Sequence, residues 1–335
     1  MDIFAFALNG NYGRFYKNLK EISKTNHIPA FIMFIDAAIS VVLFGSGLSD
    51  YLNYEFYKKS YCQRAKYVTI GYQAKAYEKL ANIKYSPYIS NKTSFHKNYS
   101  KFTKRSYIDL ADASLQDFLA YTDKYKSVVM KPVLGSGGES VEAVDLSGYS
   151  KEQLTEMFAQ LKEKKMFIEE RVVQDERWNK LSPNSLNTLR VMTCVIDGEV
   201  ELLYAATRIG SGKSVADNFH QGGMGIAINL QTGCLRGVAI DKEGIRHAES
   251  PTGVVLDGYQ VPYWDEVKQM VKEAALVNQD IHFVGWDVAL SDKGPLIIEG
   301  NRGPGFDLPQ MTEEKGLKYM LKDNLKKLKE VEKRN

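Results

Sequence analysis

The sequence predicts an α+β fold with a mostly helical N-terminal region, and three observations support this prediction. In residues 11–85, apolar side chains recur at helical spacing. In residues 110–173, helix-like segments alternate with β-branched, strand-like segments around a glycine-rich loop. From residue 188 onward, apolar runs are separated by short turn signals such as Asp197-Gly198, which is typical of antiparallel hairpins.

The N-terminal third is expected to hold three helices: one over 12–24, one over the apolar run 28–48, and one over 49–60. The middle run is nearly long enough to span a bilayer, but Asp36 lies near its centre. An acidic residue there costs about 2.5 to 3.5 kcal/mol on insertion scales. We therefore expect a buried helix in which Asp36 is a satisfied carboxylate, with membrane contact as the alternative.

The basic run SNKTSFHKNYSKFTKRSY, at 90–107, is expected to be a solvated, charged face. After it, the pattern predicts further elements in the following order: a helix at 114–125, strands at 127–133 and 140–146, a helix at 151–165, a strand at 166–173, a hairpin at 188–210, strands through 241, a helix at 264–279, a hairpin at 283–298, and a charged amphipathic helix at 313–335.

The composition of the chain limits the classes of function that it can have. Of 335 residues, 44% are hydrophobic and 25% charged, which is ordinary for a globular protein. A net charge of +3 gives no sign of nucleic-acid binding. Three cysteines are too few and too scattered for a disulfide framework or a zinc cluster, and MDIFAFALNG lacks the basic region of a signal peptide. We expect a cytoplasmic protein without a transmembrane segment, for which contact with the inner membrane face stays open.

The stretch VGWDVALSDKGPLIIEGNRGPG, residues 284–305, combines acidic residues with two apolar runs. The turn signal at 291–294 predicts a hairpin that brings Asp287 close to Glu299, with Asn301 on the same face as Glu299 if the strand continues. Two carboxylates and an amide oxygen form a ligand set for a hard cation such as Mg²⁺. A solvated hairpin end with a chance cluster is the alternative, and spacing alone leaves both open.

A second stretch, VVMKPVLGSGGES, places Lys131 on a strand before the loop Gly135-Ser136-Gly137-Gly138. Such a loop lets backbone N–H groups approach a phosphate. The lysine precedes the glycines, so this is not a Walker A loop, and the spacing does not fit a dinucleotide fingerprint. Taken alone, a lysine strand with a glycine loop is weak evidence, because glycine hairpins are common.

Two strands that otherwise look buried carry arginines, Arg190 in SLNTLRVMT and Arg208 in AATRIGSG. A buried guanidinium needs an anionic partner, which is either a neighbouring carboxylate or a ligand phosphate. For each arginine alone, a structural salt bridge is the preferred interpretation. Upstream, Glu169 and Glu170 end another apolar strand.

In this order, the pieces resemble the ATP-grasp superfamily. The segments FIEERVVQ, SLNTLRVMT, ATRIGSGKSVADNFHQGGMG, VGWDVAL and IIEGNRGPG are similar to the sugar-transfer-associated ATP-grasp proteins and the related teichuronopeptide-type group. The resemblance covers roughly residues 90–310. It implies an ATP-grasp fold, in which two α+β subdomains grip ATP: a helical region at 1–105, a small glycine-loop subdomain at 106–175, and a large antiparallel-sheet subdomain at 176–335 with the metal site and the C-terminal helix.

The resemblance also implies site residues. Lys131, with Lys92, would contact the ATP phosphates, and Arg190 and Arg208 would neutralise the transferred phosphoryl group. One or two Mg²⁺ ions would be held by Asp287, Glu299 and Asn301. The remaining implied nucleotide contacts are Gly135, Ser136, Gly137, Gly138, Glu169, Glu170, Val172 and Asp175. The loop DNFHQGG, with Asp217, Asn218, Gly222 and Gly223, is the candidate for substrate binding, and a plain connecting loop is the alternative. Asn187, in SLNTLRVMT, is a further candidate substrate contact.

The family's usual chemistry implies an ATP-dependent carboxylate–amine ligase that forms an amide through an acylphosphate. Its association with surface polysaccharides suggests that the carboxylate or the amine belongs to a sugar, for example a hexuronic acid joined to an amino acid. Two alternatives remain: a phosphotransferase that acts on a hydroxyl, and a nucleotide-binding module without activity.

Overall fold

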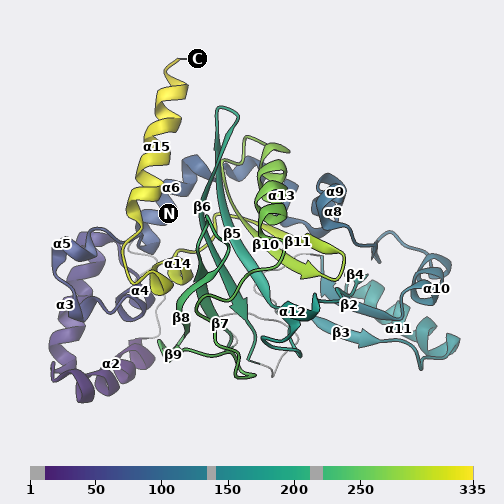
Figure 1. Cartoon of the computed structure of the whole chain (residues 1–335), viewed down its shortest axis with the longest axis horizontal. Coiled ribbons are helices and arrows are strands. Elements are labelled where there is room, and N and C mark those ends of the chain that lie inside the picture. Colours follow the sequence, from purple (N-terminus) through teal and green to yellow (C-terminus); the bar gives the residue numbers. More distant parts are fainter. Residues whose placement is uncertain (1–11, 134–140, 212–221, 335) are drawn as a thin grey trace. The chain divides into compact units, whose positions relative to one another are not determined.

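The computed structural model describes residues 12–133, 141–211 and 222–334 (Figure 1). The chain folds as two compact units. One combines residues 1–82 with 305–335, and the other comprises residues 83–304.

The first unit is helical in its described residues. Gln310 joins its two chain segments, because its side chain accepts a hydrogen bond from the Val68 N–H at 2.7 Å and donates one to the Val68 carbonyl at 3.0 Å. Its helices are α2 (Tyr12–Asn26), α3 (Ala30–Phe44), α4 (Leu48–Asn53), η1 (Phe56–Lys58), α5 (Tyr61–Arg64), α6 (Ile70–Leu80), α14 (Asp307–Thr312) and α15 (Lys318–Glu332).

The structure corrects the expectation of a buried helix at 28–48. Helix α3 buries Met33, Ala37 and Ser40 but leaves a second, wholly apolar face exposed. The expectation for Asp36 is confirmed, since its carboxylate receives two hydrogen bonds from Arg64, at 2.7 and 2.8 Å. Within the described residues, no single helix has the length and apolar character to cross a membrane, although α2 and α3, bent by 118°, reach that composition as a pair.

The second unit contains a four-stranded antiparallel sheet in the order β1-β4-β2-β3. Helices α10 (Leu115–Lys124) and α11 (Lys151–Glu163) enclose a small core with it, which includes Phe118, Val128 and Ile168. Both helices begin at serines whose side chains accept a hydrogen bond from the third helical N–H. The strands are β1 (Tyr107–Asp109), β2 (Ser127–Pro132), β3 (Glu142–Asp145) and β4 (Met166–Glu170).

The same unit contains a seven-stranded antiparallel sheet in the order β11-β10-β5-β6-β7-β8-β9. Helix α13 (Trp264–Leu276) packs against its β5 and β6, as Figure 1 shows, and contributes to the main core around Trp286. The strands are β5 (Thr188–Ile196), β6 (Glu199–Ile209), β7 (Met224–Ile228), β8 (Leu235–Asp241), β9 (Arg246–His247), β10 (Phe283–Ser291) and β11 (Gly294–Arg302).

Short helices complete this unit, and three of them, α7, α8 and α9, contact β11. They place residues from the 90–107 run beside the large sheet. The short helices are η2 (Ile83–Tyr85), α7 (Ser86–Ser90), α8 (Lys92–Asn98), α9 (Ser100–Thr103) and α12 (Glu176–Asn179).

The main differences from the expected elements lie at segment ends. Strand β11 continues to Arg302 and pairs Gly294 directly with Ser291, so the hairpin turn is tighter than expected. Gly294 has a φ of +98°, which favours glycine and permits this turn. The C-terminal helix begins at Lys318 rather than 313, because Glu314 has a φ of +51°, which does not fit an α-helix. Residues 307–312 form the separate helix α14.

Candidate functional site

The β10–β11 hairpin brings Asp287 and Glu299 together as a directly opposed pair. A β-bulge makes this possible: Val288 pairs with Ile297 and Asp287 with Glu299, so Ile298 is an extra residue. Without it, the core-facing Ile297 and the site-facing Glu299, two residues apart, would lie on one face of the strand. Asn301 also lies at the pair, since its amide donates to Asp287 at 3.3 Å and to Glu299 at 3.2 Å.

Two arginines on neighbouring strands also contact Asp287. Arg190 on β5 lies directly opposite Asp287 and donates to it through Nε, at 2.5 Å, and through a terminal nitrogen, at 3.1 Å. Arg208 on β6 reaches the same carboxylate at 2.9 Å. Gly285 gives the Arg190 stem room, because a Cβ there would lie 3.2 Å from Arg190 Cδ. The anionic partner of both arginines is therefore a neighbouring carboxylate, as the salt-bridge interpretation predicted.

The two carboxylates are in different electrostatic states. Burial opposes ionisation of Asp287, but Arg190 and Arg208 outweigh it and lower the pKa of Asp287 to about 2. Burial and the adjacent Asp287 raise the pKa of Glu299 above its usual range. A carboxylate crowded in this way becomes easier to ionise if a cation is shared with its neighbour.

The residues present fit a divalent cation. Two facing carboxylates and an amide oxygen are hard oxygen donors, and burial together with the adjacent Asp287 raises the pKa of Glu299, so a cation at the pair would favour its ionised form. Among the described residues, no group of three His, Cys, Asp or Glu side chains gathers as a metal site. The predicted ligand set, Asp287, Glu299 and Asn301, has two carboxylates and one amide, so it does not belong to that class of three His, Cys, Asp or Glu side chains.

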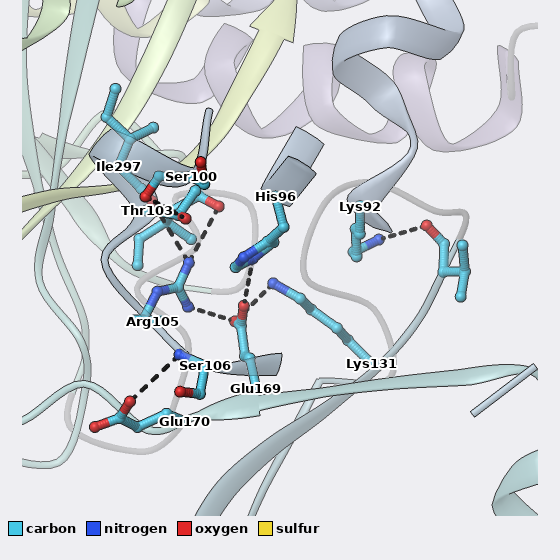
Figure 2. Close-up of polar contacts among 12 residues, drawn as sticks. Lys92, His96, Ser100, Thr103, Arg105, Ser106, Lys131, Glu169, Glu170 and Ile297 are labelled. Carbon is cyan, nitrogen blue, oxygen red and sulfur yellow. Dashed lines mark hydrogen bonds and ion pairs between the residues drawn. The ribbon is translucent and has the colours of Figure 1, made fainter. Parts of the chain in front are cut away.

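Lys131 belongs to a second buried cluster, which centres on Glu169 of β4 (Figure 2). Lys131 Nζ lies 2.6 Å from Glu169 Oε1, and Arg105 contacts the same oxygen at 2.7 Å. His96 Nε2 lies 3.2 Å from the other carboxylate oxygen. Burial alone would raise the pKa of Glu169, but Arg105, Lys131 and His96 hold it well below its usual range.

His96 and Arg105 are site residues that sequence reasoning missed. The 90–107 run was expected to be a solvated face, yet the His96 and Arg105 side chains are only 2% and 4% exposed. Arg105 also donates to the carbonyls of Ile297 and Ile298, at 3.5 and 3.4 Å. No local pattern distinguishes these two residues within the basic run, and the solvated interpretation is wrong for both of them.

Lys92, at the start of α8, lies between the two clusters. Burial and Lys131 lower the pKa of Lys92, while Glu299 and Glu169 offset that effect. Its ammonium also lies 3.5 Å from the Val133 carbonyl, at the end of the strand that carries Lys131 (Figure 2). The structure therefore brings Lys92 and Lys131 together near Glu299.

The segment after β4 leads from the small sheet to the large hairpin. The Asp292 N–H donates to the Val173 carbonyl, and the Asp175 N–H donates to the Leu290 carbonyl. Glu170 accepts from the Ser106 N–H at 3.4 Å, and Val172 is half-buried. Asp175 caps α12, and its carboxylate accepts hydrogen bonds from the side chains of Arg177 and Tyr263. A ribose contact by Asp175 would have to share these oxygens.

Of the expected substrate-binding residues, the structure describes Asn187, Gly222 and Gly223. Asn187 is fully buried, and its amide donates to the carbonyls of Trp178 and Ser182 while its oxygen accepts from the Gly210 N–H. This is a structural position, so we leave Asn187 out of the substrate site. Gly222 and Gly223 lead into β7. Asp217, Asn218, Gly135, Ser136, Gly137 and Gly138 lie outside the described residues.

The sequence profile of the sugar-transfer associated ATP-grasp family matches residues 53–327. The chain belongs to this family. The match confirms the resemblance, and the two antiparallel sheets with a helical N-terminal region confirm the predicted α+β fold class of an ATP-grasp protein. The division into subdomains at 106–175 and 176–335 stays a prediction.

The solved structures to which this ATP-grasp protein is similar have low sequence identity to it. The ATP-grasp ligase PsnB, complexed with precursor peptide PsnA2 and AMPPNP, is 14% identical, with 75% of this chain and 62% of PsnB covered and a TM-score of 0.46. D-Alanyl-alanine synthetase A from Vibrio cholerae O1 biovar eltor is 14% identical, with coverage of 72% and 66% and a TM-score of 0.44. The chain thus spans about 62% of the length of PsnB. No curated protein matches the sequence.

Proposed function

We propose that this chain is an ATP-dependent carboxylate–amine ligase, and the arrangement of charges around Asp287 carries the proposal. Two carboxylates, two guanidiniums and two lysines gather in one buried region of the second unit. Side chains of both signs at close quarters suit a substrate that is itself a highly charged complex of phosphates and cation. Membership in an ATP-grasp family supports ATP as that substrate.

Lys131 and Lys92 are the proposed phosphate contacts. In the structure Lys131 pairs with Glu169, and Arg105 pairs with the same carboxylate. Lys131 can therefore turn toward a phosphate while Arg105 still neutralises Glu169. Glu170 and Val172 are proposed to contact the adenine from the segment after β4. The loop at 135–138 is proposed to cover the phosphates.

Asp287, Glu299 and Asn301 are the proposed holders of Mg²⁺, as one ion or two. A bound Mg²⁺ offsets phosphate charge and polarises the γ-phosphoryl oxygens. Glu299 gains most from the cation, because burial and Asp287 beside it raise its pKa. Asn301 would turn its amide oxygen toward the ion and its NH₂ group away from it.

The proposed reaction has two steps. An oxygen of the substrate carboxylate attacks the γ-phosphorus, the bond to the bridging oxygen breaks, and ADP leaves with the electron pair, which yields an acylphosphate. The amine then attacks the acyl carbon, inorganic phosphate leaves, and the nitrogen releases a proton to form the amide. Arg190 and Arg208, held beside Asp287, would stabilise the charge that spreads over the phosphoryl oxygens.

The proposed substrates are a carboxylate and an amine, of which one belongs to a sugar, as in a hexuronic acid joined to an amino acid. The family's association with sugar transfer supports this class, and assembly of a surface polysaccharide is the proposed setting. The segment 217–223, with Gly222 and Gly223, is the proposed acceptor loop.

Trapping with hydroxylamine tests the assignment. The full chain is incubated with Mg-ATP, hydroxylamine and a panel of uronic acids and amino acids. A ligase yields a hydroxamate from one acid, together with ADP. A phosphorylated alcohol without a hydroxamate would establish the phosphotransferase instead, and ATP that stays intact with every substrate would support a module that binds nucleotide without turning it over.

A further inference from the structure

Helix α3 carries an exposed apolar face. Six large side chains contribute to it, with exposed fractions of 64% for Phe31, 55% for Ile32, 45% for Ile35, 37% for Ile39, 75% for Val42 and 57% for Leu43. They are spaced by one, three or four positions, so they lie along one side of the helix, with the exposed Ala38 among them. Single exposed apolar residues are normal, but a charge-free stripe along a whole helix marks an interaction surface.

Polar contacts on the opposite side of α3 determine which face of the helix is exposed. Asp36 binds Arg64 through both carboxylate oxygens and accepts from the Tyr51 hydroxyl at 2.8 Å. Arg64 also donates to Ser40 at 2.9 Å. Because these polar contacts hold α3 to its own unit, the helix cannot rotate its apolar side inward without breaking a largely buried ion pair.

A basic helix adjoins this apolar face. Exposed residues of α2 include Arg14, Lys17, Lys20 and Lys24, and Glu21 is the only acidic residue in its sequence. Phe34 of α3 contacts the rings of Phe15 and Tyr16, so the two helices pack directly. At the other end of α3, Phe44 contacts the half-exposed ring of Tyr61. Cationic side chains and tyrosines beside an apolar stripe are typical of helices that lie at a membrane surface.

We propose that the α2–α3 pair docks the protein onto an anionic lipid surface, with the apolar face of α3 lying flat in the interface and the cations of α2 at the headgroups. The lipid class follows from charge complementarity. Helix α3 has 15 residues and is therefore about 22 Å long, which is shorter than the ~30 Å hydrocarbon core of a bilayer. Together with the paired Asp36, this length favours a helix that lies on the membrane over one that spans it.

A second copy of the chain is a poorer occupant of this face. A two-fold contact through α3 would bring two copies of α2 toward each other, and each carries four cations against one anion. Their repulsion opposes such a dimer, whereas phosphatidylglycerol or a similar lipid is attracted. The proposal concerns residues of the first unit and does not depend on the ligase assignment.

Vesicle flotation of the full-length protein tests the proposal. The vesicles are pure phosphatidylcholine or contain about one third phosphatidylglycerol. The wild type is expected to float with the anionic vesicles, and less so as salt is raised. Ile35→Glu/Val42→Glu should lower the partition coefficient by about tenfold or more, because two charges enter the apolar face. Ile245→Glu/Val255→Glu is the matched control, since these residues of the other unit are 57% and 62% exposed.

A charge variant separates the two contributions. Lys17→Glu/Lys20→Glu should weaken binding to anionic vesicles by about fivefold or more for each lysine and leave any binding to neutral vesicles unchanged. Far-UV circular dichroism confirms that each variant is folded. A wild type that stays in solution with anionic vesicles overturns the proposal, as does an α3 double variant that floats like the control. If the wild type is a dimer by light scattering and Ile35→Glu/Val42→Glu is a monomer, a second copy covers the face and the lipid proposal is wrong.

Discussion

Arg190 and Asp287 face each other across β5 and β10 and share two hydrogen bonds, at 2.5 and 3.1 Å. The pair is nearly buried, with exposed side-chain fractions of 15% and 4%. Asp287 also binds Arg208 and lies opposite Glu299, so two guanidiniums and two carboxyl groups gather at this point. A cation that neutralised the carboxylates would leave the guanidiniums available to a further anion, such as a phosphate.

Replacing Arg190 should separate binding from chemistry. Arg190→Ala is expected to lower turnover far more than it weakens ATP binding, because charge spreads over the phosphoryl group in the transition state. Arg190→Lys should stay well below the wild type, since an ammonium cannot reproduce the planar fork. Melting temperature, ATP affinity and ATP consumption with substrate are measured on the same preparations. If Arg190→Ala folds stably and turns over normally, Arg190 is only a structural partner of Asp287.

Glu299→Gln should remove the response to Mg-ATP without harming the free protein. The substitution removes a carboxyl group whose pKa is raised by burial and by the adjacent Asp287, so the melting temperature without ligand should stay equal or rise. In the wild type, ligand at about 100 times its Kd adds about 2.7 kcal/mol of stability. That gain should largely disappear in Glu299→Gln. Asp292→Asn, exposed in the turn of the same hairpin, is the control and should keep it.

Lys131→Ala should weaken nucleotide binding by about 1.5 to 3 kcal/mol, because a charge-assisted contact to phosphate is lost. Isothermal titration with ATP or a non-hydrolysable analogue measures the change. Lys126→Ala is the control, since Lys126 precedes the same strand and its side chain is 50% exposed. Equal affinity in wild type and Lys131→Ala would remove Lys131 from the phosphate site.

Glu169→Gln should destabilise the fold by about 3 kcal/mol or more, because Arg105 and Lys131 would lose their shared buried counter-charge. Denaturant unfolding measures the free energy. The neighbouring Glu170→Gln is the matched control: Glu170 is half-buried and contacts the Ser106 N–H at 3.4 Å, so its change should be small. Similar losses in both variants would show that the three-way cluster has no special importance.

His96 should make stability fall in mild acid. Burial lowers the pKa of His96 in the folded protein, and Glu169 offsets this effect only in part. Below the unfolded value of about 6.5, the unfolded chain therefore binds a proton that the folded chain does not, so stability decreases as pH falls. His96→Gln removes this contribution. The wild type should lose stability between about pH 7 and 5 more steeply than His96→Gln, by up to about 1.4 kcal/mol per pH unit. Parallel pH profiles would contradict the assignment.

Local sequence patterns were sufficient to predict the elements that build the metal hairpin. The apolar runs around 291–294 predicted β10 and β11, and the structure pairs Asp287 with Glu299 as expected. Hairpin pairing depends on residues close in sequence, and the turn sets the register as far as Val288 and Ile297. The β-bulge at Ile298, which the sequence did not predict, then places Glu299 rather than Ile298 opposite Asp287. Lys131 on β2 was predicted in the same way, from a short β-branched run.

Contacts between distant segments were decided by tertiary structure. Arg190 needed an anion, but only the order of the sheet, which places β5 beside β10, identified Asp287, 97 residues away. His96 and Arg105 looked like parts of a solvated run because their partner, Glu169, is far along the chain. The apolar run at 28–48 predicted a helix, whereas the pairing of Asp36 with Arg64 decided which side of α3 is exposed. Hydrophobic periodicity indicates whether a segment forms a helix or a strand. It does not indicate which segments pack against each other, because that depends on how all of them are buried together in the fold.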